Sequence, residues 1–469
     1  MTTATVVGSG PNGLAAALTL AAAGADVTVL EAADRLGGGA TSSELTLPGL
    51  VHDECSAIHP LAVGSAFAKE FDLASAGLVW RWPEVQFSHP LDGGRGAALW
   101  QSVDETSAGL GSDGRSWQRL FGPLADRFAP LSADILQPVV RVPHHPVHLA
   151  RFGAYAALPI PALARRWETP EARGLFAGAA AHTFRPLSGV LSSSIPVALG
   201  ASAHALGWPV AEGGTGEISR AMIELATAHG ATFETGVFVT SLHQIQPSDI
   251  VMLDTSPRAA AAIVGDLMPP RVSRAYRRYR HGPGAFKVDY AVEGGVPWTH
   301  EPSRSSGTVH LGGTFEEIAA IERAVSRGQM PERPFVLIGQ QYVADPSRSR
   351  DGVHPLYAYA HVPSGYTGDA TEAITSQIER FAPGFRDRIR ATHVRTTVDL
   401  ESGNANFIGG DIIAGANTAR QLVFRPRATL HPYATGVDGI YLCSAATPPG
   451  AGAHGMCGYN AARYALRQA

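Results

Sequence analysis

The stretch Thr5-Val6-Val7-Gly8-Ser9-Gly10-Pro11-Asn12-Gly13-Leu14 decides the fold of this chain. Its apolar start predicts a buried strand, and its three glycines follow the spacing G-x-G-x-x-G that joins a strand to a helix. The alanine-rich run up to Ala23 predicts that helix, and Val27–Leu30 predicts a second strand. A turn of this kind presents unpaired N–H groups and the positive end of a helix dipole, which together bind the phosphates of a dinucleotide. The stretch therefore predicts a Rossmann-type α/β domain.

The residues after the second strand extend this prediction. Glu31 ends the strand, where a carboxylate accepts hydrogen bonds from a ribose diol and disfavours a 2′-phosphate, so NADP is not expected. Arg35 and a glycine run follow, and they offer a guanidinium and a close main-chain approach to a cofactor. The cofactor-binding residues predicted in this region are Gly8, Gly10, Pro11, Asn12, Gly13, Glu31, Ala32, Arg35, Gly37, Gly38, Gly39, Ala40 and Thr41.

Composition and charge exclude several classes of protein. The chain has 469 residues, of which 45% are hydrophobic and 17% charged, and its net charge is −4, so we expect a compact enzyme without a nucleic-acid partner. Three cysteines without metal spacing predict no metal site and no disulfide framework, and the start of the chain shows no basic signal region, so we expect a cytoplasmic protein. The apolar segment 151–167 predicts peripheral membrane contact at most, and a helix over a substrate channel is the alternative.

Separated segments of the chain resemble one family. Asp438–Arg463 combines a buried strand, a glycine turn and a terminal helix, and it resembles the closing FAD motif of phytoene desaturase-like flavoproteins. The closer match is their pyridine nucleotide-disulfide oxidoreductase domain-containing protein 2 branch, within the glutathione-reductase/amine-oxidase flavoprotein superfamily. The other segments that carry the resemblance are Gly8–Gly39, Trp208–Gly214, Gly403–Asp411 and Gln421–Pro426. The resemblance implies FAD as the cofactor.

The carboxyl-terminal motif and its surroundings predict further contacts to FAD. A glycine turn followed by a helix start would place N–H groups near the flavin edge that becomes negative on reduction. The additional cofactor-binding residues that we expect are Val237, Phe238, Thr255, Ala445, Gly455 and Met456. Gly450-Ala451-Gly452 stands where three glycines are usual, and this departure leaves the substrate open. No second G-x-G-x-x-G with its own βαβ context follows, so we expect electrons from an organic substrate and not from NAD(P)H.

The order of predicted elements indicates two domains. Helical patterns fill much of 91–204, and alternating β-branched and aromatic residues mark strands within 281–404. The predicted fold class is α/β: a Rossmann-type FAD-binding domain with an inserted α+β substrate domain (mixed sheet plus helices). We expect the FAD-binding domain to comprise 1–90, 205–280 and 405–469, and the substrate-binding domain to comprise 91–204 and 281–404.

Three residues are candidates for catalysis. Lys287 begins a predicted strand, and the related amine oxidases carry a lysine on such a strand that holds a water at flavin N5; a solvated strand-edge lysine is the alternative. His454 and Cys457 lie in the turn expected beside the flavin, where they would position the substrate or exchange protons. Packing within the turn is the alternative for both.

Three further residues are expected to bind the substrate, namely His59, His182 and Arg185. A histidine whose hydrogen bonds are satisfied within the core is the alternative for His182.

These observations predict an FAD-dependent oxidoreductase, acting as a dehydrogenase, desaturase or oxidase. A small apolar organic substrate would pass a hydride to flavin N5, and oxygen or a quinone would take up the electrons. The sequence leaves open whether the protein forms a homodimer. Two other functions also stay open: redox-neutral isomerisation on reduced FAD, and a non-catalytic binding protein of the same fold, as the Rab escort and dissociation-inhibitor proteins are. The intact glycines, Glu31 and Arg35 argue against the binding protein.

Overall fold

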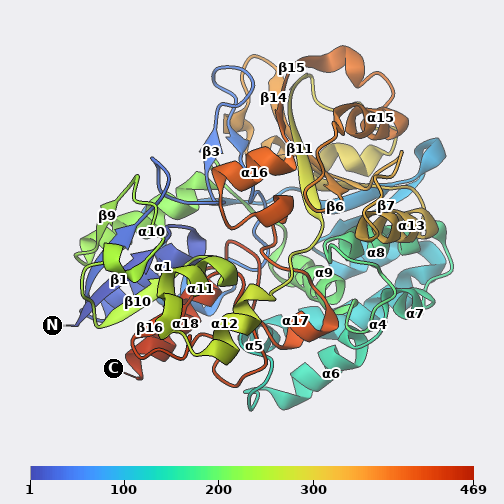
Figure 1. The fold of residues 1–469 in the computed structure, drawn as a ribbon. Coiled ribbons are helices and arrows are strands. Elements are labelled where there is room, and N and C mark those ends of the chain that lie inside the picture. Colours follow the sequence, from blue (N-terminus) through green and yellow to red (C-terminus); the bar gives the residue numbers. More distant parts are fainter. Residues whose placement is uncertain (1, 469) are drawn as a thin grey trace.

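A five-stranded parallel sheet forms the first layer of the computed structural model, which describes residues 2–468 (Figure 1). The strand order is β16-β10-β1-β2-β9. The strands are β1 (Thr3–Val7), β2 (Asp26–Leu30), β9 (Thr232–Glu234), β10 (Ile250–Leu253) and β16 (Ile440–Leu442). They are short apolar runs because a parallel sheet is covered on both faces. Segments from the start, the middle and the end of the chain thus meet in one sheet, and both ends of the chain lie on this side of the molecule in Figure 1.

Helices cover both faces of this sheet. On one face, α1 (Pro11–Ala22) packs between α10 (Gly216–Ala228) and α18 (Met456–Leu466). On the other face lie α11 (Pro257–Val264) and α12 (Pro270–Arg277). Successive strand residues alternate between these two cores, as Val6 and Val7 do.

A seven-stranded mixed sheet forms the second part of the molecule. Its order is β15-β11-β14-β13-β12-β6-β7, and only β12 and β6 run parallel. The strands are β6 (Val85–Pro90), β7 (Gly96–Trp100), β11 (Gly284–Glu293), β12 (Ser306–Leu311), β13 (Val336–Gly339), β14 (Val353–Val362) and β15 (Ile389–Arg395). The second sheet therefore begins at residue 85, before the boundary at residue 91 that the sequence suggested.

Helices also cover both faces of the second sheet. One face packs on α15 (Thr371–Phe381). The other face packs on α13 (Phe315–Ser326) and on the helical segment between β7 and residue 206. The helices of that segment are α3 (Val103–Gly109), α4 (Gly114–Ala125), α5 (Phe128–Ile135), α6 (Pro146–Ala156), α7 (Ile160–Ala164), α8 (Pro170–Ala181) and α9 (Ser194–Leu206). The predicted α/β fold class, with a Rossmann-type sheet and a mixed sheet, is confirmed.

A buried ion network joins the two sheets. The Arg348 guanidinium, which is 1% exposed, donates to Asp53 Oδ2 at 2.6 Å and to Asp345 Oδ2 at 3.0 Å. Asp53 also accepts the Thr215 N–H at 2.7 Å, and Asp345 accepts the Gly213 N–H at 2.8 Å, both in the turn before α10. Arg348 lowers the pKa of Asp53, against burial, which raises it. The network therefore ties the segment between β13 and β14 to the turn before α10, a helix that packs on the parallel sheet.

Candidate active site

The glycine turn between β1 and α1 packs tightly against the end of β10. A Cβ on Gly13 would lie 2.1 Å from the Gly8 carbonyl oxygen, so no larger residue fits there. A Cβ on Gly10 would lie 2.7 Å from the Asp254 carboxylate. Pro11 occupies the first turn of α1, where a missing N–H costs nothing. The predicted fingerprint therefore has the geometry that brings a ligand close to the main chain.

Two carboxylates lie at the ends of neighbouring strands beside this turn. Glu31 follows β2 and accepts the Ser9 N–H at 2.7 Å and the Ala33 N–H at 2.9 Å. Asp254 follows β10 and accepts the Gly13 N–H at 2.9 Å, and burial raises its pKa to about 7. Asp254 was not predicted from the sequence, whereas its neighbour Thr255 was. An apolar strand that ends in an acid, as β2 does, is the signal that points to it.

Two buried polar atoms near the turn suit a polar ligand. Asn12 Oδ1 and Thr255 Oγ1 have no hydrogen-bond partner among residues 2–468. A buried polar atom without a partner is costly, so a ligand that supplies one is favoured. Asn12 also lines a cavity that opens at the amino-terminal end of α1. The Asn12 oxygen needs a hydrogen-bond donor and the Thr255 hydroxyl can donate or accept, so both atoms suit the ribose hydroxyls of a dinucleotide.

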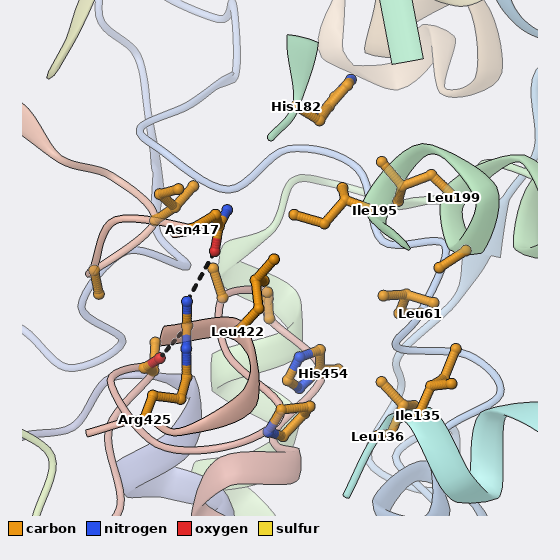
Figure 2. Close-up of a pocket in the computed structure, with 18 of the residues that line it drawn as sticks. Leu61, Ile135, Leu136, His182, Ile195, Leu199, Asn417, Leu422, Arg425 and His454 are labelled. Carbon is orange, nitrogen blue, oxygen red and sulfur yellow. Dashed lines mark hydrogen bonds between the residues drawn. The ribbon is translucent and has the colours of Figure 1, made fainter. Parts of the chain in front are cut away.

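The cavity has a volume of about 740 Å³ and continues away from the turn. Its wall includes Gly10–Asn12, then Ser444–Ala446 and Ala451–His454 of the carboxyl-terminal motif. Farther on, aliphatic side chains form a chamber, with Leu61, Ile135, Leu136, Ile195 and Leu199 drawn in Figure 2. Tyr357 and Tyr359 of β14 also line it. One continuous space therefore joins the nucleotide turn to an apolar chamber.

The carboxyl-terminal motif contributes His454 to this wall. Its Nδ1 accepts the Met456 N–H at 3.1 Å, and burial lowers the pKa of the imidazole to about 4. The ring is thus neutral at pH 7, and its proton is on Nε2. Gly455 adopts φ 69° at the start of α18. The Met456 N–H, which we expected to face the cofactor, is occupied by His454.

Cys457 packs within the same motif. Its Sγ donates to the Gly450 carbonyl at 3.2 Å and approaches the Thr447 carbonyl at 3.4 Å. Burial raises the pKa of this thiol to about 12, so it stays protonated at neutral pH. Cys457 is absent from the cavity wall. A catalytic role for it stays a prediction, and the contacts favour packing.

Lys287 lies in the amino-terminal half of β11, behind the cavity wall. It is 2% exposed, its Nζ pairs with Asp289, and it lies 4.4 Å from the ring centroid of Tyr357. Burial lowers the pKa of Lys287, and Asp289 opposes that shift. Tyr357 lines the cavity and donates its hydroxyl to the Cys55 carbonyl at 2.6 Å. Lys287 is therefore separated from the cavity by the ring of Tyr357 and is far from solvent.

Two of the three expected substrate residues line the cavity. The His59 ring nitrogen Nε2 lies 3.0 Å from Thr215 Oγ1, and burial lowers its pKa to about 4. His182 Nε2 lies 2.9 Å from His310 Nε2, and burial lowers its pKa to about 3. Arg185 lies next to the wall and donates to the Asn417 carbonyl at 2.6 Å. All three are thus near the same space, and His310 is the partner that the sequence did not reveal.

Of the other predicted cofactor residues, Gly39 lines the cavity, and the rest lie outside its wall. Arg35 is half exposed, pairs with Glu54 and donates to Ser43 Oγ at 2.9 Å. The Val237 N–H donates to the Glu31 carbonyl at 2.8 Å, and Phe238 is 61% exposed. These positions surround the carboxylate expected at the ribose, and their contacts to a cofactor stay predictions. No three His, Cys, Asp or Glu side chains within 2–468 are grouped as metal ligands.

The fold and the site together define a class of fold, in which a Rossmann-type sheet with a glycine turn is joined to a second, mixed sheet over one cavity. Residues 6–69 match the family model of an NAD(P)-binding Rossmann-like domain. Among solved structures, a redesigned putrescine oxidase superposes with a TM-score of 0.61 at 18% identity, over 100% of this chain and 99% of the other. This likeness shows the fold.

Several curated proteins are similar in sequence. Pyridine nucleotide-disulfide oxidoreductase domain-containing protein 2 of Rattus norvegicus is 25% identical over 300 residues, which are 55% of this chain and 51% of the relative. The match thus spans about half the length of that relative. Phytoene dehydrogenase of Streptomyces griseus is 25% identical over 491 residues, covering 95% of this chain and 91% of the relative. The predicted resemblance to these proteins is confirmed. Within residues 2–468, each helix is too short or too polar to cross a bilayer.

Proposed function

We propose that this chain is an FAD-dependent oxidoreductase that oxidises a small, mainly apolar organic substrate in the cavity between its two sheets. The observation that carries the proposal is the continuity of that cavity, which runs from Gly10–Asn12 past Ser444–Ala446 to the aliphatic chamber at Ile195 and Leu199. A dinucleotide bound at the turn and a substrate bound in the chamber would therefore meet beside the carboxyl-terminal motif.

The chain's own residues supply binding and orientation. The positive end of the α1 dipole and the Asn12 main-chain N–H would hold the diphosphate, because Pro11 has no N–H and the Gly13 N–H donates to Asp254. Glu31 would accept a hydrogen bond from a ribose hydroxyl. When bound, FAD supplies a hydride acceptor at flavin N5. Ala445 and His454 lie on the wall that leads from the turn to the chamber. We propose oxygen or a quinone as the final electron acceptor and the cytoplasm as the compartment, where the three free cysteines would stay reduced.

The apolar chamber supports substrate oxidation in a second way. Its aliphatic wall excludes water, which strengthens each remaining polar contact and limits side reactions. His454 holds its proton on Nε2 and stays neutral above a pKa of about 4. Lys287 holds a proton behind the ring of Tyr357, and we keep it as the proposed proton-handling residue on this side.

The test uses the purified full-length chain and its visible absorbance spectrum. We expect one FAD per chain, bleaching under anaerobic conditions by one class within a panel of amines and saturated or partly unsaturated apolar compounds, and return of the colour with oxygen or a quinone. A preparation that stays colourless after addition of FAD would contradict the proposal and favour a binding protein. Substrate conversion without net bleaching, seen only on pre-reduced FAD, would favour isomerisation.

A further inference from the structure

Two arginines converge on one side of the cavity without an acidic partner. Arg425 lines the cavity and is 3% exposed, and Arg185 lies next to the wall. Both bind Asn417: Arg425 donates to its side-chain Oδ1 at 2.8 Å, and Arg185 donates to its carbonyl at 2.6 Å. Within residues 2–468, neither guanidinium forms an ion pair with a carboxylate. A charge as buried as that of Arg425 is normally paired, so its arrangement is unusual, whereas Arg185 is partly exposed.

The contacts of Arg425 leave donors free. Its Nε donates to the Gln421 carbonyl at 3.1 Å, and one terminal nitrogen donates to the Ala445 carbonyl at 3.2 Å. With the bond to Asn417, these are three hydrogen bonds to neutral acceptors, whereas a guanidinium has five N–H donors. The remaining donors and the full positive charge are available to an acceptor in the cavity.

A second arginine of the same wall provides the contrast. Arg141 also lines the cavity, and it pairs with Asp134 at 2.5 Å. The buried Asp411 does not take this role for Arg425, because its Oδ2 accepts the Gly282 and Gly415 N–H groups at 2.7 and 2.8 Å and lies 3.3 Å from His281. The chain thus neutralises one cavity arginine and leaves the charge of the other uncompensated.

The opposite side of the chamber is aliphatic. Figure 2 shows Arg425 and Asn417 on one side of the cavity, with Ile195 and Leu199 on the other. We propose that Arg425, Arg185 and Asn417 form an anion-binding subsite, and that the substrate is an apolar molecule carrying a carboxylate. The carboxylate binds at Arg425, and the apolar part lies along Ile195 and Leu199. This inference rests on the proposed function, because it assigns the chamber to the substrate.

The FAD diphosphate is the other source of an anion in this cavity, and the experiment separates the two. Decanoate and decanol are the probes, and calorimetry measures their binding to the FAD-loaded full-length chain. We expect decanoate to bind about tenfold more tightly than decanol, or better, which is the size expected for hydrogen bonds between charged groups. Arg425→Met should abolish that preference and leave both decanol binding and FAD affinity unchanged. Arg425→Lys should retain part of the preference.

Controls keep the test decisive. Arg165→Met removes an exposed arginine and should change neither affinity. Arg185→Met should also weaken decanoate binding. If the Arg425→Met protein does not fold, the Arg185→Met protein is tested in its place. Equal binding of decanoate and decanol to the unaltered chain would overturn the inference. So would an Arg425→Met protein that loses FAD affinity but keeps its preference for decanoate, because the arginine would then serve the diphosphate. A chain that takes up no FAD would contradict the proposed function, whereas decanoate binding can still be measured on it.

Discussion

The two ends of the cavity are built in different ways. At the nucleotide end, the turn, the helix start and the ribose carboxylate all come from Gly8–Glu31, a continuous piece of chain. At the chamber end, the wall combines α5, α6, α9 and β14 with the loop around Arg425. The main chain of one segment forms the nucleotide end, and side chains from distant segments form the chamber end. The nucleotide end is therefore suited to one invariant ligand, and the chamber end determines what that ligand acts on.

The largest expected effect breaks the connection between the two ends. Arg348→Met would leave Asp53 and Asp345 buried without their cation, and it should lower the free energy of unfolding by about 3–5 kcal/mol. Urea unfolding followed by circular dichroism measures this change. Arg350→Met is the matched control, because Arg350 is 63% exposed and should contribute about 0.5 kcal/mol or less. A loss as small as that of the control would show that the network does not hold the sheets together.

The next effect is confined to the nucleotide end. Gly10→Val places side-chain atoms where a Cβ already lies 2.7 Å from the Asp254 carboxylate, so FAD affinity should fall by about 100-fold while the chain remains folded. Fluorescence titration with FAD measures the affinity. Gly403→Ala, at an open position, should leave it unchanged. Retention of FAD by the valine variant would remove the turn from the site.

A pH effect follows from Asp254. Burial raises its pKa to about 7, so the carboxyl is neutral below that value and charged above it. A charged Asp254 would repel the FAD diphosphate, and affinity should therefore fall above pH 7 by up to about tenfold per pH unit. In the cofactor-free protein, the stability contribution of the neutral form is complete below pH 3.8 and is lost as the pH rises through about 7. Asp254→Asn should flatten both profiles, and a slope retained in that variant would assign it to another group.

These differences also explain what the sequence could predict. Gly8, Gly13 and Glu31 were predictable because their spacing is local and each has a distinct physical role. Arg425 lies in a segment that carries the family resemblance, yet its role depends on Asn417, Ala445 and the absence of an acidic partner, which only the folded chain shows. His310 meets His182 across 128 positions, and no local pattern links them.

The smallest expected effect tests whether Cys457 of the carboxyl-terminal motif is catalytic or structural. Cys457→Ala removes the hydrogen bond from the thiol to the Gly450 carbonyl and should lower stability by about 1 kcal/mol, with the turnover rate unchanged, because the thiol with a pKa of about 12 is protonated at working pH. Thermal unfolding and steady-state rates measured on the same preparation check this. A strongly reduced rate at unchanged stability would restore the catalytic assignment.

A crystal structure of the chain with FAD tests the central claim most directly. We expect the diphosphate to lie at Gly10–Asn12 and the flavin ring to lie beside Ala445 and His454, with one face open to the aliphatic chamber. A flavin ring that lies outside the chamber, with protein side chains between the ring and the chamber, would contradict the proposal that cofactor and substrate meet in one cavity.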